Sequence, residues 1–349
     1  MIEEAIQKIS KKINLTASEM EDIFCQIAEG KIAEDKIASF LVALSHKGEA
    51  AQEIAGAARA MRRYVSRIIV DRKVVLDTCG TGGDQKKTFN VSTVTAFVVA
   101  GAGITVAKHG NRSVSGTCGS ADLLEAMGVN VNAGIDVVEK CIRDIGIGFL
   151  YAPLLHPAMR FVQPVRKKLK TKTIFNILGP LINPSFPTHQ LLGVFDKRLV
   201  SVLGAALKDL GVQHAMVVWG EGGFDEATTT AETFVCEVRE GTIKEYMLDP
   251  QKLDIPRATL EDLVGGGCDV NKQIALNVLK GVEGPCRDIV LLNTACCIYL
   301  AGSVSTIKEA LSLAAESIDS GAAIKKLNKL IEYTNEHSKG DPKFQEGIS

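Results

Sequence analysis

The beginning of the chain has a helical pattern of apolar positions. Thr16 and Glu19 have the spacing of a capping box, and Met20, Phe24 and Ile27 then recur at helical intervals. Two further apolar stripes follow, separated from the first and from each other by the glycines Gly30 and Gly48: Ile37, Phe40, Leu41 and Leu44, then Ile54, Ala58 and Met61. The pattern predicts a helical N-terminal domain over residues 1–72, with no strand before Val74.

From residue 74 onward, short apolar runs alternate with helical segments. The predicted strands are 74–76, 104–106, 147–150, 191–195 and 215–219, with helices between them that include 94–100 and 121–127. Strands that alternate with helices require crossover connections, which favour parallel pairing. The predicted fold class is therefore α/β: a small all-helical domain plus a larger domain with a mainly parallel central sheet flanked by helices.

Three later segments depart from this alternation. Residues 232–247 are predicted to form a hairpin that turns at Glu240 and Gly241. Residues 156–187 are rich in proline and basic side chains, and since a parallel sheet does not need them, we expect part of this segment to join the helical domain. The chain is helical again from 270, so the α/β domain is placed at 73–338, and the polar residues 339–349 are expected to be a frayed tail.

Composition excludes several classes of protein. The 349 residues contain 40 basic and 41 acidic side chains, a net charge of −1, which argues against a general nucleic-acid or membrane-surface binder. Nine cysteines without a C-x-x-C pair indicate small buried side chains in a reducing compartment, which predicts a cytoplasmic protein. The acidic residues Glu3 and Glu4 do not fit a signal peptide, and no membrane span is expected.

The sequence Gly80-Thr-Gly-Gly-Asp84 follows the first predicted strand. Ligands of open α/β sheets bind beyond the carboxyl ends of strands, and glycines let backbone N–H groups approach phosphate oxygens. The sequence is neither a P-loop nor a dinucleotide fingerprint, because Gln85 stands where the third glycine of that fingerprint belongs. An ordinary strand-to-helix turn is an equally good interpretation of this loop alone.

Asn90-Val-Ser-Thr93 lies at the start of the next predicted helix. Its hydroxyls and free N–H groups form a potential anion site, although simple N-capping is the more common reason for such residues. The second predicted strand is followed by Lys108-His-Gly-Asn-Arg-Ser-Val-Ser-Gly116, with two basic side chains and two serines, and Ser120 opens the helix after it. Two polar loops at the same sheet edge favour a phosphate site over two solvated loops.

Two further features suggest binding chemistry. Asp225 and Glu226 follow a predicted strand, and adjacent carboxylates suit Mg²⁺, which takes its other ligands from water and substrate phosphates. Arg166 lies in a basic stretch with Lys167 and Lys168. Its guanidinium can bind a substrate carboxylate through two hydrogen bonds, in bidentate geometry. The two lysines are instead predicted to lie on a solvent-exposed face of a helix.

These motifs, with Asn176-Ile-Leu-Gly-Pro180, occur in the order found in the anthranilate phosphoribosyltransferase family, which the chain resembles over nearly its whole length. The resemblance implies transfer of phosphoribose from phosphoribosyl pyrophosphate to anthranilate in tryptophan biosynthesis. It also implies a homodimer that forms through the helical domain, and an active site between the two domains. The related pyrimidine nucleoside phosphorylases share the fold but have a different loop sequence.

Carried over by position, the resemblance assigns three sets of residues. Phosphoribosyl pyrophosphate would be bound by Gly80, Gly83, Asp84, Thr88, Asn90, Val91, Ser92, Thr93, Lys108, His109, Gly110, Asn111, Arg112, Ser113, Val114, Ser115, Gly116 and Ser120. Anthranilate would be held by Gly80, Asn111 and Arg166, and Mg²⁺ by Ser92, Asp225 and Glu226. Three positions depart from the family pattern: Gln85 and Gly116, which affect details of pyrophosphate contact, and Trp219, which replaces a frequent histidine.

The implied reaction breaks the bond from C1 to pyrophosphate through a transition state that resembles an oxocarbenium ion. Charge on the departing pyrophosphate would be neutralised by Mg²⁺, Lys108 and backbone N–H groups. The amine of anthranilate is neutral and needs no dedicated base, so His109, the one candidate, is more simply a structural histidine. The alternatives are a pyrimidine nucleoside phosphorylase and a non-catalytic relative that binds nucleic acid.

Overall fold

The computed structural model describes residues 1–83, 86–113 and 118–336. They belong to two compact units. Unit 1 consists of Met1–Arg67, Cys79–Lys86 and Ala152–Arg257, and unit 2 consists of Ile68–Thr78, Lys87–Tyr151 and Ala258–Ser349. Several predictions fall outside the described residues: the tail 339–349, and the positions Asp84, Gln85, Val114, Ser115 and Gly116.

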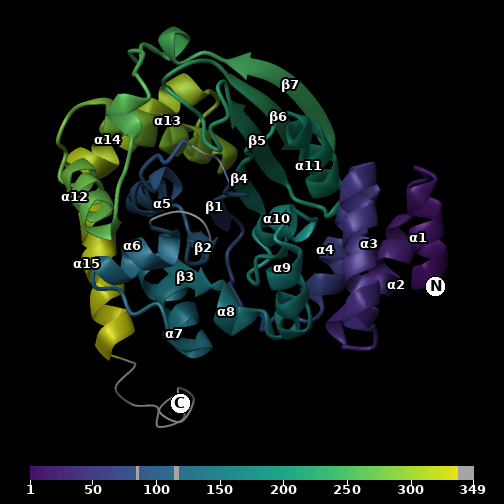
Figure 1. Ribbon diagram of the computed structural model, residues 1–349. Coiled ribbons are helices and arrows are strands. Elements are labelled where there is room, and N and C mark those ends of the chain that lie inside the picture. The colour runs from purple at the N-terminus through teal and green to yellow at the C-terminus, as the bar shows by residue number, and fades with distance from the viewer. Residues whose placement is uncertain (84–85, 114–117, 337–349) are drawn as a thin grey trace. The chain divides into compact units, whose positions relative to one another are not determined.

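Unit 1 begins with four helices that lie side by side (Figure 1): α1 (Ile2–Ser10), α2 (Ala17–Ala28), α3 (Glu34–Lys47) and α4 (Ala51–Arg62). The predicted capping box is confirmed, because Glu19 N donates to Thr16 Oγ1 over 3.2 Å and Thr16 N donates to Glu19 Oε2 over 2.8 Å. The glycines predicted to end α2 and α3 have positive φ angles, 70° at Gly30 and 88° at Gly48. The apolar stripes thus predicted α2, α3 and α4 correctly but gave no stripe for α1, and α4 ends ten residues before residue 72.

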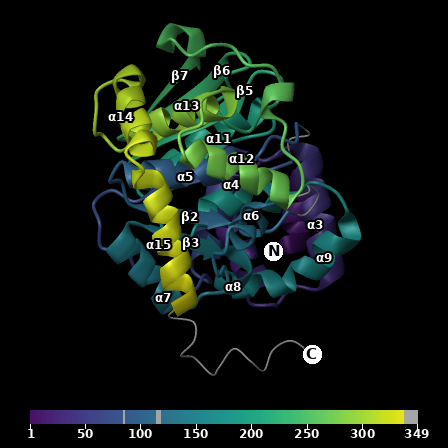
Figure 2. The ribbon, with the colours of Figure 1, turned by 90° about the vertical axis from the view of Figure 1, so that its left-hand side faces the viewer.

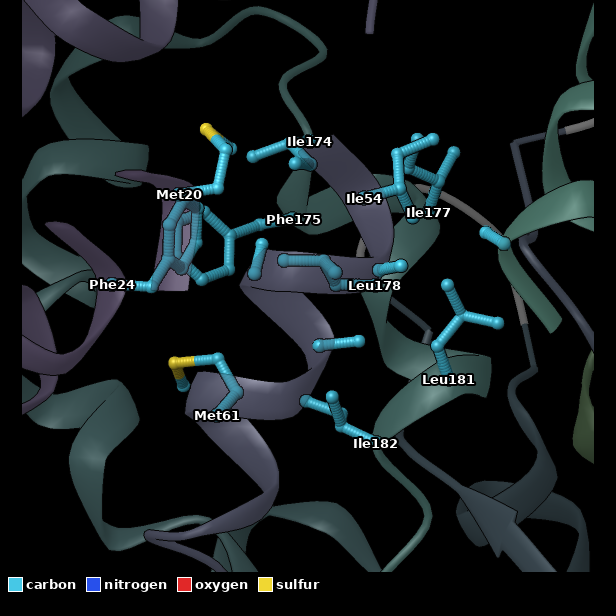
Figure 3. Close-up of a cluster of buried hydrophobic side chains, with 14 of the residues drawn as sticks. Met20, Phe24, Ile54, Met61, Ile174, Phe175, Ile177, Leu178, Leu181 and Ile182 are labelled. Atoms are coloured by element: carbon cyan, nitrogen blue, oxygen red, sulfur yellow. The ribbon is translucent and has the colours of Figure 1, made fainter. Parts of the chain in front are cut away.

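The segment that begins at Ala152 packs on these helices again. It contains α8 (Ala152–Leu155), α9 (Gln163–Leu169) and α10 (Phe175–Leu178), and α9 packs against α3. Figure 3 shows the apolar side chains of 174–182 against Met20, Phe24 and Met61, and the rings of Phe24 and Phe175 are 5.5 Å apart. Burying one large apolar side chain stabilises a fold by about 1.5–3 kcal/mol, so this cluster holds the segment on the bundle.

In the described part of the chain, seven strands occur in the order β3-β2-β1-β4-β5-β6-β7. They are β1 (Leu76–Gly80), β2 (Val106–Gly110), β3 (Ile147–Tyr151), β4 (His189–Gly193), β5 (His214–Gly220), β6 (Thr233–Arg239) and β7 (Thr242–Leu248). The pairs β1–β2, β2–β3 and β4–β5 are parallel, and the pairs β5–β6 and β6–β7 are antiparallel. The predicted hairpin is confirmed: Glu240 and Gly241 have φ angles of 48° and 76°, as a two-residue type I′ turn requires.

Helices cover the strands within each unit. In unit 1, α11 (Arg198–Asp209) packs on β5 and β6. Unit 2 contains α5 (Val91–Gly101), α6 (Ser120–Ala126), α7 (Ile135–Lys140), α12 (Cys268–Leu279), α13 (Pro285–Leu300), α14 (Ile307–Asp319) and α15 (Ala322–Glu336). Figure 2 shows α15, in yellow, against α5, whose side chains are buried on almost every side. No helix in the described part of the chain combines the length and the apolar character that crossing a bilayer requires.

The bounds of three strands differ from the prediction for a physical reason. The predicted strands 74–76 and 104–106 are displaced toward the C-terminus, because β1 and β2 contain the buried polar residues Asp77, Thr78, Lys108 and His109. The predicted strand 191–195 is displaced the other way, because β4 begins with His189 and Gln190, which are also buried. Apolar periodicity cannot locate strand positions whose polar side chains are held inside by hydrogen bonds.

Candidate functional site

The glycine loop that follows β1 folds directly onto Asp225 in unit 1. Gly82 N donates to Asp225 Oδ2 over 3.1 Å, and Thr81 N donates to Gly193 O over 2.9 Å. Gly82 and Gly83 have φ angles of +63° and +82°, which side chains rarely adopt. Up to Gly83, the loop thus presents backbone groups next to a carboxylate.

Two glycines in this region are required by close approach. A Cβ atom on Gly80 would lie 2.6 Å from Asp225 Oδ2, and one on Gly193, the last residue of β4, would lie 1.5 Å from Asp225 O. Gly193 was missed as a functional position. A glycine inside a predicted apolar strand is a signal of close backbone approach, so the sequence did hold a clue to it.

Lys172 is a second residue that sequence reasoning missed. Its Nζ lies 3.4 Å from the centre of the Phe195 ring, and 3.5 Å from the point that a Cβ on Gly83 would occupy. It therefore places a cation beside the glycine loop within unit 1. The sequence offers several basic residues between 166 and 172, and no pattern distinguishes this one.

Lys108, on β2 in unit 2, is buried with only 3% of its surface exposed. Its Nζ donates to Thr78 O over 2.7 Å and to Ser92 Oγ over 3.3 Å. Next to it, His109 N donates to the buried carboxylate Oδ1 of Asp77 over 3.2 Å. Burying a charge is expensive unless it is held by hydrogen bonds, so this lysine is fixed beside the first turn of α5 by its neighbours.

Asn90 stands at the N-cap position of α5, yet its side chain makes no capping hydrogen bond. Instead Asn90 Nδ2 donates to Cys118 O, and Asn90 Oδ1 accepts from Asn271 Nδ2, each over 3.0 Å. Simple N-capping, the more common reason for such a residue, is therefore wrong for Asn90. Its amide connects three segments of unit 2.

Arg112 has its guanidinium bound by side chains of its own unit. It donates to Asp122 over 2.9 Å, to Glu125 over 2.8 and 3.0 Å, and to the hydroxyl of Tyr151 over 3.1 Å. These hydrogen bonds raise the pKa of Arg112 above its usual value, and the bond to Glu125 contributes most. Burial raises the pKa of Asp122, but backbone N–H groups of Ser113 and Gly119 outweigh it and lower that pKa overall. Arg112 thus shapes its loop, and Lys108 is the better placed cation.

The described ends of this loop, residues 110–113 and 118–120, are tightly packed. A Cβ atom on Gly119 would lie 2.3 Å from Ser113 N, and one on Gly110 would lie 3.1 Å from the Cβ of Ser120. Asn111 accepts hydrogen bonds from Ala121 N at its carbonyl and from Arg112 N at Oδ1. The start of α6 and the end of β2 are therefore held together within unit 2.

Arg166 lies on α9 in unit 1. Its guanidinium carbon is 5.9 Å from the centre of the Phe175 ring, and burial lowers the pKa of Arg166. Among the residues that the structure describes, none forms an ion pair or hydrogen bond with this guanidinium. A half-buried guanidinium beside an aromatic ring is suited to a carboxylate ligand.

Burial lowers the pKa of His156 to about 4. No motif in the sequence had drawn attention to this residue.

The structure thus groups the predicted residues by unit. Unit 1 contains Gly80, Gly83, Arg166, Asp225 and Glu226; unit 2 contains Thr88, Asn90, Val91, Ser92, Thr93, Lys108, His109, Gly110, Asn111, Arg112, Ser113 and Ser120. In the described ranges, no cluster of three or more histidine, cysteine or acidic side chains forms a ready-made metal cage. A pair of adjacent carboxylates is an arrangement that Mg²⁺ accepts when phosphates complete its coordination.

Two family models match the chain. One, described as the helical bundle domain of a glycosyl transferase family, matches residues 3–65, and the other, the a/b domain of that family, matches residues 72–324. The second match alone spans more than half of the chain.

Several proteins are similar over nearly their full length. The anthranilate phosphoribosyltransferase of Anaeromyxobacter sp. (strain K) is 49% identical over 96% of this chain and 99% of its own, and that of Alkaliphilus metalliredigens is 46% identical over the same shares. The crystal structure of the Thermus thermophilus enzyme has a TM-score of 0.90 and 41% identity, over 95% of this chain and 99% of its own. The Saccharomyces cerevisiae enzyme in complex with phosphoribosyl pyrophosphate and Mg has a TM-score of 0.87 and 29% identity, over 96% of this chain and 98% of its own.

Proposed function

Because the chain belongs to the anthranilate phosphoribosyltransferases of the glycosyl transferase family, we propose that it transfers phosphoribose from phosphoribosyl pyrophosphate to the amine of anthranilate. The products are N-(5-phosphoribosyl)anthranilate and pyrophosphate, and the step belongs to L-tryptophan biosynthesis. The observation that best supports this function in the molecule itself is the buried Lys108, held against Ser92 at the start of α5.

Phosphoribosyl pyrophosphate is proposed to bind the polar loops that follow β1 and β2. The glycine loop and the first turn of α5 donate backbone N–H groups, those of Gly83 and Ser92, to phosphate oxygens, and Lys108 supplies positive charge. Arg112 stays in the proposed set, with its role directed to the shape of the loop because two carboxylates already bind its guanidinium. His109 is proposed to contribute through its position and not as a base.

Anthranilate is proposed to be held by Arg166 and Asn111, with Gly80 close to both substrates. The support for Arg166 is its half-buried guanidinium beside Phe175, since an arginine at an aromatic ring can bind a carboxylate and contact the ring of the substrate. Holding the amine in line with C1 lowers the barrier through orientation alone, and the mechanism then needs no general base.

Magnesium is proposed to be held by Asp225, Glu226 and Ser92. The donor set fits, because Asp225 lies at the glycine loop and Glu226 follows it, and because Mg²⁺ takes only one or two carboxylates from the protein when phosphates are its other ligands. When bound, the ion neutralises charge that develops on the departing pyrophosphate. The chain itself orients the diphosphate through Lys108 and the loop N–H groups.

The test of this function is a fluorescence assay that follows the loss of anthranilate with and without phosphoribosyl pyrophosphate and Mg²⁺. We expect turnover only when both are present. The double variant Asp225→Asn, Glu226→Gln should lose most of its turnover and its response to a Mg²⁺ titration, while Gly82 N keeps an amide oxygen as acceptor. An unchanged Mg²⁺ dependence would remove the metal assignment. Phosphorolysis of thymidine without anthranilate turnover would favour a nucleoside phosphorylase instead.

Three further properties are proposed. The enzyme is proposed to be a homodimer that forms through the helical domain of residues 1–72, which light scattering on the full chain tests. It is proposed to act in the cytoplasm, a reducing compartment, in keeping with small buried cysteines such as Cys141, Cys236 and Cys297. The domains are proposed to be a helical domain of residues 1–72, joined by part of 156–187, and an α/β domain of residues 73–338; the packing of 174–182 on the first helices supports the joined segment.

A further inference from the structure

The glycine-rich segment before α12 contacts the part of the chain that leads into α5. Gly265 N donates to Lys87 O over 2.8 Å, and Phe89 N donates to Leu263 O over 3.1 Å. Thr88 forms an antiparallel bridge with Val264 between them. Within unit 2, the two segments therefore pair like short strands, although they are far apart in the sequence.

Asn271, on the first turn of α12, extends this contact to Asn90. It is 3% exposed; its Oδ1 accepts from Gly266 N over 2.7 Å, and its Nδ2 donates to Asn90 Oδ1 over 3.0 Å. Asn90 Nδ2 donates in turn to Cys118 O over 3.0 Å. A backbone donor stands at one end of this chain of bonds and a backbone acceptor at the other, so both side-chain amides have only one satisfactory orientation.

Glycine is required where the two segments meet. A Cβ atom on Gly265 would lie 2.4 Å from Asn271 Oδ1 and 2.9 Å from the Cα of Phe89. A Cβ on Gly267, two residues later, would meet nothing within 4 Å. The close approach at Gly265 is thus specific to the position that faces Asn271 and Phe89.

This arrangement explains why Asn90 does not cap α5. Its side chain is turned toward Asn271 and Cys118, and α5 has no side-chain cap in its first turn. The side-chain oxygen of Asn90 therefore accepts from none of the N–H groups at that end of α5, whereas its backbone carbonyl accepts from Thr93 N and Val94 N over 3.0 and 3.2 Å. Cys118 itself comes just after the loop that begins at Lys108, so the amide of Asn90 connects both predicted phosphate segments of unit 2.

We propose that Asn271 is a positioning residue for phosphoribosyl pyrophosphate: it fixes the amide of Asn90 and, through it, the chain at Cys118. The proposal rests on the proposed function, which assigns Thr88 and Asn90 to that substrate. Asn271 does not touch the substrate itself. Its loss therefore raises the KM for phosphoribosyl pyrophosphate and leaves the KM for anthranilate nearly unchanged.

The test uses Asn271→Asp, which keeps an acceptor for Gly266 N but cannot donate to Asn90 when ionised. We expect the KM for phosphoribosyl pyrophosphate to rise about tenfold, the effect of one lost hydrogen bond, with less change in kcat. The matched control is Asn277→Asp on the same helix, where the side-chain oxygen accepts only a neighbouring glutamine N–H among the described contacts. Equal rises in both KM values, or an equal effect of the control, would overturn the proposal.

A double-variant cycle separates positioning from a merely structural role. If Asn271 acts through Asn90, then Asn90→Ala with Asn271→Ala should raise that KM no further than Asn90→Ala alone. Effects that multiply would show two independent roles and contradict the proposal. Gly265→Ala should raise the same KM, and Gly267→Ala should not, which keeps the test decisive if an Asn271 variant fails to fold.

Calorimetric titration of the wild-type chain with phosphoribosyl pyrophosphate distinguishes the two levels of failure. If the wild type does not bind it, the proposed function fails and the positioning role fails with it. If the wild type binds it and Asn271→Asp binds it equally well, only the role of Asn271 is refuted.

Discussion

Two lysines are buried to a similar degree in different regions, one in the helical bundle of unit 1 and one in the strands of unit 2. The Lys47 side chain and the residue Lys108 are each 3% exposed. Lys47 Nζ donates to Asn14 Oδ1, Gly48 O and the carboxylate of Glu53. The two described donations of Lys108 go to neutral oxygens, Thr78 O and Ser92 Oγ.

In the helical bundle, the buried charge of Lys47 is paired with a buried carboxylate. Glu53 is fully buried, and it accepts from Leu15 N, Ala50 N and Lys47 Nζ over 2.7–2.8 Å. Lys108 is instead held against the start of α5, where the proposed function places phosphates. The comparison teaches that burial alone does not separate a structural charge from a functional one; the two lysines differ in their surroundings, which are a helical bundle for Lys47 and the start of α5 for Lys108.

The largest expected effect is that of Lys108→Met. We expect kcat/KM for phosphoribosyl pyrophosphate to fall about 100- to 1000-fold, because one preorganised donor in a water-poor site contributes about 3–4 kcal/mol. Steady-state kinetics measures this, with Lys208→Met, an exposed lysine on α11, as the matched control. A Lys108→Met enzyme that is folded and turns over at the wild-type rate would contradict the role of this cation.

The Lys47–Glu53 pair should affect stability and not catalysis. Glu53→Gln leaves the buried Lys47 ammonium without its carboxylate, and we expect the free energy of unfolding to fall by about 3 kcal/mol. Urea unfolding measures it. The exposed pair Lys168–Glu34 provides the control, since Glu34→Gln should change that free energy by less than about 1 kcal/mol. If Glu53→Gln instead raised a KM without loss of stability, the distinction between the two lysines would be lost.

A smaller effect is expected at the glycine loop. Gly80→Ala places a methyl group against the Asp225 carboxylate, so the carboxylate must move, and we expect about a tenfold loss of kcat/KM from the misplacement. Gly179→Ala is the control, because a Cβ there meets nothing within 4 Å. Equal activities of the two variants would show that the contact of Gly80 with Asp225 is not needed for turnover.

The smallest effect concerns pH. Burial, and then the neighbouring His214, lowers the pKa of His189 from 6.5 to about 4 in the folded protein. Between these pH values the unfolded chain binds more protons at His189 than the folded protein does. The contribution of this residue to the free energy of unfolding is therefore complete above pH 6.5 and is lost as the pH falls toward 4. The urea concentration at the midpoint of unfolding should decrease when the pH is lowered from about 7 to about 5. It should decrease less in His189→Asn. An identical decrease in both proteins would show that His189 does not contribute to this acid sensitivity.

Local patterns predicted much of the fold. The capping box at Thr16, the helix ends at Gly30 and Gly48, and the hairpin at Glu240 and Gly241 each depend on neighbouring residues, and all are confirmed. The strand bounds of β1 and β2 were displaced, because Asp77 and Lys108 are polar residues whose burial depends on partners distant in the sequence.

The sequence predicted candidate site residues only where they stand in motifs. Gly80, Asn90, Lys108 and Asp225 stand in recognisable motifs, whereas Gly193, Lys172 and Asn271 do not. Asn271 donates to Asn90, which lies 181 residues earlier in the chain, and no local pattern indicates that the two residues are partners. The paired segments 87–89 and 263–265 illustrate the same limit, because a contact between distant segments leaves no local periodicity.

The central claim is that Lys108 is a buried cation for the diphosphate of phosphoribosyl pyrophosphate. Its most direct test is a calorimetric titration of this compound, in Mg²⁺ buffer, into wild-type protein and into Lys108→Met protein of equal thermal stability. The account predicts that the wild type binds and that the variant binds at least about 100-fold more weakly. Equal affinity in the two proteins would contradict it.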